Sequence, residues 1–162
     1  MKPLYFSTHL LIFLSFLSAF VLNIIPLTPL IALFYPLWLP LILIYWVIIL
    51  PEHIHLTLAW ILGLLIDVLH GSYLGEHSLA LCILTFLSYR FHLQFRMFPL
   101  IQQILFVLML LVIYQGLLVS MQSWLGLAIN FHWMWFPLLV SALLWPFLKN
   151  LLKIDAQDTR GC

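Results

Sequence analysis

The sequence predicts an all-α integral membrane protein, a bundle of six transmembrane helices forming one domain over residues 1–162. Of the 162 residues, 65% are hydrophobic and only 7% are charged, whereas a soluble domain carries roughly 25% charged residues. A spanning helix takes about 20 apolar residues, so six helices fill most of the chain and leave no room for a soluble domain. The third observation is that a six-span arrangement places all six Lys and Arg residues on one side.

The first three predicted spans cover residues 5–25, 36–50 and 54–70. The first run is longer than the core of a signal peptide, which is about 7–15 residues, so we expect an uncleaved helix. The second span has Pro36 and Pro40 near its start and Pro51 at its end, which favours a kink or a late helix start. The third span is short and follows the break at Pro51.

The last three predicted spans cover residues 76–90, 99–120 and 134–152. A polar, glycine-bearing turn at 71–77 precedes the fourth span. Residues 90–96 are predicted to form an amphiphilic loop, whose cations reach headgroup phosphates while its aromatic side chains lie in the interface. A tryptophan-bearing loop at 122–132 precedes the sixth span, and a short solvated tail follows it.

The distribution of positive charge predicts the orientation of the chain. With both termini in the cytoplasm, the predicted outside loops near 26–36, 71–77 and 122–132 contain no Lys or Arg. The inside segments then contain Lys2, Arg90, Arg96, Lys149, Lys153 and Arg160. Because short cytoplasmic loops are enriched in Lys and Arg, we expect a multi-pass membrane protein with both ends in the cytoplasm.

Motifs for catalysis, cofactors and metals are not found in the sequence. It contains no phosphate-binding glycine loop, HExxH motif or paired carboxylates, and no basic run that indicates nucleic-acid binding. His70, Glu76 and His77 flank one turn, but their spacing matches no familiar set of metal ligands. We therefore predict no catalytic residue, no cofactor and no metal site.

Asp67 is the only carboxylate inside an apolar run. Gly63, Asp67 and Gly71 are four residues apart, so they share one face for as long as the helix continues, and Gly75 follows. Glycines at this spacing allow a neighbouring backbone to approach closely, with the carboxylate facing protein. Two interpretations stay open: a residue near the interface that accepts hydrogen bonds from backbone amides or Tyr73, or a buried polar anchor. Ion or proton transport is a weaker third.

The second span combines helix-breaking and aromatic residues: Pro36, Trp38, Tyr45 and Trp46. Trp38 is expected near an interface, whereas Tyr45 and Trp46 lie about two turns deeper, where the indole N–H needs a partner. These side chains either pack against neighbouring helices or form a groove that faces a partner or lipid.

Several of these motifs together resemble one protein family. They are Pro36-x-Trp38 with Tyr45-Trp46 and Pro51, then Gly63-x3-Asp67-x3-Gly71-x2-Leu74-Gly75, and Leu144-Trp145-Pro146. In their order and in the six-span frame, they resemble the MreD family of rod shape-determining proteins of the bacterial inner membrane.

The resemblance implies a non-enzymatic component of the cell-elongation complex, which maintains rod shape by binding MreC and helping to regulate lateral peptidoglycan synthesis. The other implied partners are MreB, RodZ, RodA, a penicillin-binding transpeptidase and membrane lipids. For contact with MreC, the face of Gly63, Asp67 and Gly71 and the aromatic second span are the best candidates.

Two alternatives to this function stay open. The family resembles the substrate-binding subunits of energy-coupling-factor transporters, which are six-helix bundles, so a subunit of a small-molecule transporter is the main alternative. A membrane enzyme acting on a lipid carrier through Asp67 is a third possibility.

Overall fold

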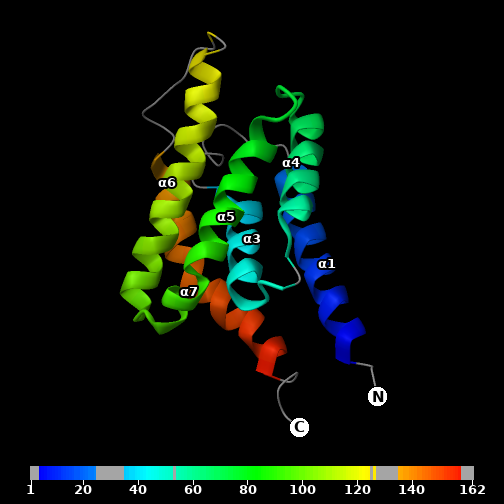
Figure 1. The fold of residues 1–162 in the computed structure, drawn as a ribbon, viewed down its shortest axis with the longest axis vertical. Coiled ribbons are helices and arrows are strands. Elements are labelled where there is room, and N and C mark those ends of the chain that lie inside the picture. Colours follow the sequence, from blue (N-terminus) through cyan, green and yellow to red (C-terminus); the bar gives the residue numbers. More distant parts are fainter. Residues whose placement is uncertain (1–3, 25–34, 53, 125, 127–134, 158–162) are drawn as a thin grey trace.

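The computed structural model describes residues 4–24, 35–52, 54–124, 126 and 135–157, and within them the chain is all-helical (Figure 1). The helices are α1 (Leu4–Ile24), α3 (Trp38–Ile49), α4 (Leu56–His70), α5 (Glu76–Met97), α6 (Leu100–Trp124) and α7 (Trp135–Gln157). The predicted all-α class is therefore confirmed for this part of the chain. The predicted loops near 26–36 and 122–132 lie largely outside the described residues, as do Lys2 and Arg160.

α3 is the central helix, and every residue from Leu39 to Ile48 is buried. It contacts α1, α5, α6 and α7. A helix that is apolar on all sides is stable only when other helices surround it. The apolar second span thus forms the core around which the other helices pack.

Prolines set several helix ends. α3 begins at Trp38, just after Pro36, and contains Pro40 in its first turn, where the missing N–H has no intrahelical partner to lose. α5 continues to Met97 and stops before Pro99, with Phe98 in an extended conformation, as the residue before a proline prefers.

The expectation of a loop over residues 90–96 was therefore wrong, because these residues form the last two turns of α5. The segment contains neither Pro nor Gly, so nothing in it interrupts a helix before Pro99.

α4 and α5 approach each other closely at Gly63. A Cβ atom built on Gly63 would lie 2.1 Å from the Cα atom of Ser78, well inside van der Waals contact. Gly63 and Ser78 are both buried. A glycine is required here because the two backbones touch.

The helices run between two ends of the bundle. The start of α1, the end of α5 and the end of α7 lie at one end, while the α4–α5 turn and the end of α6 lie at the other (Figure 1). Among the described residues, α6 is the one helix with both the length and the apolar composition needed to cross a bilayer. Shorter apolar helices cover Leu10–Ile24, Trp38–Ile49, Leu56–His70 and Trp135–Leu151.

We expect Gly63→Ala to reduce the stability of the bundle, since the added methyl group forces α4 away from α5. Overpacking of this kind costs about 1–3 kcal/mol, which thermal unfolding of the detergent-purified protein will measure. Gly116→Ala in α6 is the matched control, because a Cβ there meets nothing within 4 Å. Equal melting temperatures for the two variants would refute the close approach.

Candidate functional site

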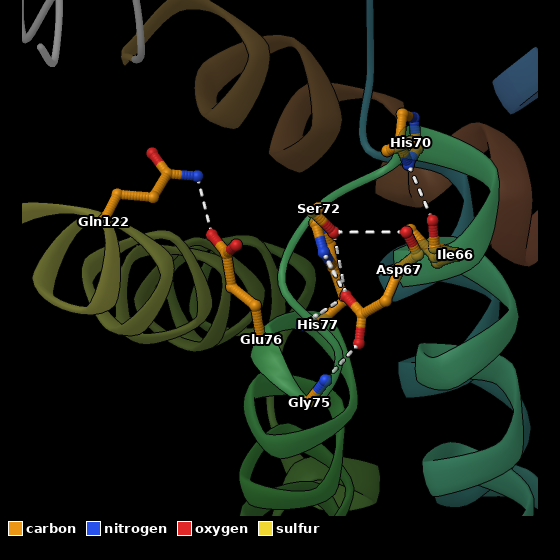
Figure 2. A network of polar contacts seen from close by, with 8 residues as sticks. All are labelled: Ile66, Asp67, His70, Ser72, Gly75, Glu76, His77 and Gln122. Carbon is orange, nitrogen blue, oxygen red and sulfur yellow. Dashed lines mark hydrogen bonds and ion pairs between the residues drawn. The ribbon is translucent and has the colours of Figure 1, made fainter. Parts of the chain in front are cut away.

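The carboxylate of Asp67, in the last turn of α4, holds the start of α5 (Figure 2). Its Oδ2 atom accepts the backbone N–H of Gly75 at 2.8 Å, and its Oδ1 atom accepts the N–H of His77 at 2.9 Å. The Asp67 side chain is fully buried. Because the first N–H groups of a helix have no intrahelical acceptor and carry a partial positive charge, Asp67 serves as the N-terminal cap of α5.

Two side chains complete the shell around Asp67. The Nδ1 atom of His77 lies 2.8 Å from Oδ1 and forms an ion pair when the imidazole is protonated. The hydroxyl of Ser72 donates to the same oxygen at 3.2 Å. The His70 ring stacks on His77 with centroids 5.8 Å apart. All these donors come from the turn and the helix that follow Asp67, so the carboxylate ties α4 to α5.

Two glycines shape the turn that brings these donors to Asp67. Gly71 ends α4 with φ +61°, and Gly75 precedes α5 with φ +107°, a region that favours residues without a Cβ. The N–H of Ser72 donates to the Asp67 carbonyl at 3.1 Å. Since α4 ends at His70, the glycine face continues only from Gly63 to Asp67, and Gly71 and Gly75 shape the turn. A Cβ on either would meet nothing within 4 Å.

A second carboxylate, Glu76, lies in the first turn of α5 and points toward α6 (Figure 2). Its Oε1 atom accepts the side-chain amide of Gln122 at 2.6 Å. Asp67 and Glu76 thus define an acidic end of the bundle.

The opposite, basic end is defined by Arg96 and Lys149. The Nε and Nη2 atoms of Arg96 donate to the Ile48 carbonyl at 3.1 and 2.8 Å, and Nη2 also donates to the Ile49 carbonyl at 2.8 Å. The Nζ atom of Lys149 donates to Gln103 at 2.9 Å. Arg96 therefore binds the last carbonyls of α3, which carry a partial negative charge.

The aromatic residues of the second span lie inside the bundle. Tyr45 packs against Trp46 and Trp145, with ring centroids 5.4 and 6.3 Å apart, and Trp46 Nε1 donates to Ser15 Oγ at 2.8 Å. Pro36 is buried and Trp38 is half-buried. The structure thus agrees with packing against neighbouring helices, the first of the two interpretations, for Tyr45 and Trp46.

Several partners were not predicted from the sequence. For Asp67 the expected partners were backbone amides or Tyr73; the amides are correct, but the side-chain partners are Ser72 and His77. Arg96 was expected in a loop at the headgroups, whereas it lies in α5 and binds the last carbonyls of α3. The sequence did contain a signal for the contacts of Asp67. This residue stands in the last turn of one helix, and a short glycine-bearing turn leads from it to the next helix.

We expect Asp67→Asn to loosen the start of α5. Asparagine has one carbonyl oxygen, so its NH₂ group must face an N–H donor of Gly75 or His77. An unsatisfied buried donor costs about 1–3 kcal/mol, and hydrogen exchange at the amides of residues 75–78 should become faster. Glu52→Gln, at an exposed position, is the control. Unchanged exchange in Asp67→Asn would contradict the cap.

We also expect Arg96→Gln to lower stability by about 1–2 kcal/mol, because α3 loses a charged donor at its last carbonyls. Arg96→Lys should restore only part of this loss, since an ammonium group lacks the planar fork of donors. Thermal unfolding in detergent measures both variants. Arg90→Gln, at an exposed position of the same helix, should leave the melting temperature unchanged, and an equal loss there would argue against a specific contact.

Comparison with known proteins gives one family. The profile described as rod shape-determining protein MreD matches residues 5–154. The rod shape-determining protein MreD of Haemophilus influenzae is 32% identical over 139 residues, which are 85% of this chain and 85% of the relative. No solved structure matches the chain, so the likeness to energy-coupling-factor subunits stays a prediction. From these matches, the chain belongs to the MreD family of rod shape-determining proteins.

Proposed function

We propose that this chain is a non-enzymatic, multi-pass component of the cell-elongation complex, which binds MreC and helps regulate lateral peptidoglycan synthesis. The match to the MreD family carries this proposal, and it supports a role in rod shape determination. The use of the polar groups agrees with it. The Asp67 carboxylate is occupied by donors from the chain itself, which suits a structural role.

The arrangement of charge supports six spans with both ends in the cytoplasm. Arg96 belongs to the last turn of α5, and Lys149 contacts Gln103 in the first turn of α6. These turns lie at the end of the bundle where α1 starts and α7 ends (Figure 1). Asp67 and Glu76 lie at the opposite end, where Lys and Arg are missing from the described side chains. Because positive residues favour the cytoplasmic side, we place the basic end in the cytoplasm and the acidic end in the periplasm.

The burial of the candidate residues limits how MreC binds. Gly63, Asp67 and Tyr45 are buried inside the bundle, so their contribution to a complex is to hold the helices in place. The surface that meets MreC must consist of outward-facing side chains. Such faces are apolar, for example Trp60, Leu65 and Val68 on α4, and helices in lipid select one another by close packing on such faces.

Depletion of the chain in a rod-shaped host should make the cells round, and a plasmid copy should restore rods. A tagged copy should recover MreC from detergent extracts in clear excess over an unrelated multi-pass protein with the same tag. Gly63→Leu should fail in both assays because it separates α4 from α5, while Glu52→Gln should behave as the wild type. Rods that persist after depletion, or MreC recovered only at the level of the unrelated protein, would refute the proposal.

A further inference from the structure

A pocket of about 610 Å³ lies at the acidic end, between the α4–α5 turn and the last turns of α6. Its volume is in the range of small-molecule sites, about 300–1,000 Å³. The pocket is lined by Tyr73, Leu74, Gly75, Glu76 and Leu79 on one side and by Ser120, Met121 and Trp124 on the other. None of these residues has a role in the capping of α5 by Asp67 except Gly75.

Glu76 is the charged group of this pocket, and it is only 5% exposed. Its Oε1 atom accepts from Gln122, whose amide is neutral. The imidazole of His77, the next residue, contacts Asp67 instead. A buried carboxylate is costly unless a cation or several donors compensate it, and the described residues supply one neutral donor. The described lining of the pocket therefore contains no cation to balance this carboxylate.

The other polar groups of the pocket also favour a ligand that donates hydrogen bonds. The Ser120 hydroxyl gives its proton to the Leu117 carbonyl at 2.8 Å, so its oxygen has only lone pairs to offer. The N–H of Gly75 is taken by Asp67. The rings of Tyr73 and Trp124, which are 56% and 93% exposed, border the pocket, and aromatic faces attract cations.

We propose that this pocket binds the ammonium group of an aminophospholipid headgroup of the phosphatidylethanolamine type. The ammonium has three N–H donors for the acceptors Glu76 and Ser120. Leu74, Leu79 and Met121 line the pocket around the carboxylate and suit the apolar part of a lipid. Exposed Tyr and Trp side chains are typical of the membrane interface, where headgroups lie.

A lipid suits this pocket better than a peptide segment. The backbone at its wall is helical from Glu76 onward and in α6, so its hydrogen-bonding groups are used within the helices, and the amide of Gly75 is occupied by Asp67. No free strand edge is therefore present in the described lining for an extended chain to pair with. The phosphate remains outside, since the described lining contains no cation.

The test uses the full chain in vesicles of phosphatidylethanolamine and phosphatidylglycerol in equal parts. After detergent extraction, native mass spectrometry counts the lipids that stay bound. Glu76→Gln should lower retained phosphatidylethanolamine about tenfold, because one charge-assisted contact is lost, and leave phosphatidylglycerol unchanged. Glu52→Gln, an exposed carboxylate near the opposite end, is the matched control and should retain the wild-type amount.

A second measurement keeps the wild-type chain and changes the lipid. Phosphatidylcholine carries the same charge but lacks N–H donors, so it should be retained less than phosphatidylethanolamine. Equal retention of the two lipids, or undiminished phosphatidylethanolamine in Glu76→Gln, would overturn the proposal. If Glu76→Gln keeps its lipid but loses a co-purifying protein, a basic side chain of that protein occupies the pocket and the lipid proposal fails. These outcomes are independent of whether the chain restores rod shape.

Discussion

The ends of helices buried inside an apolar bundle impose the strongest constraint on this structure. The first N–H groups and last C=O groups of a helix have no intrahelical partners, and hydrocarbon offers none. α3 has 12 residues, about 18 Å at 1.5 Å per residue, so it is shorter than the roughly 30 Å hydrocarbon core. Its ends are satisfied by other helices. Ser141 of α7 accepts the N–H of Leu37 at 2.8 Å, and Arg96 of α5 donates to the last carbonyls of α3.

At the start of α5, too, another helix satisfies the unpaired backbone N–H groups. This contact depends on the close packing of α4 against α5. The cap of α5 is Asp67, one helical turn after Gly63. A side chain as short as aspartate reaches the amides of another helix only when the two backbones lie close together. Gly63 permits that approach, because its missing Cβ leaves room for the Ser78 backbone. The spacing of Gly63 and Asp67 thus couples close packing to capping, and α5 in turn carries Arg96 to α3.

The sequence allowed prediction of those features that depend on local pattern. Apolar runs and prolines indicated the helices, and the four-residue spacing of Gly63 and Asp67 indicated an inward-facing carboxylate. The contact of Arg96 was not predictable, because Ile48 lies 48 residues away and an amphiphilic composition fits an interfacial loop as well as a helix. The end of α4 at His70 was predictable, because the polar, glycine-bearing segment 71–77 indicated a turn after the third span. That end depends on the left-handed conformation of Gly71, which assigns the last two glycines to a turn.

Asp67 and Glu76 are nine residues apart and both buried, yet their surroundings give them different roles. Asp67 accepts two backbone amides, a hydroxyl and an imidazole, all supplied by residues 72–77. Its charge is compensated as soon as the turn and α5 have folded, so it needs no ligand. Among the described residues, Glu76 has one neutral donor, Gln122 of α6, and it lines a pocket bordered by aromatic rings. Asp67 therefore stabilises the fold, whereas Glu76, with a single neutral donor among the described residues, is the group through which the proposed headgroup ammonium binds.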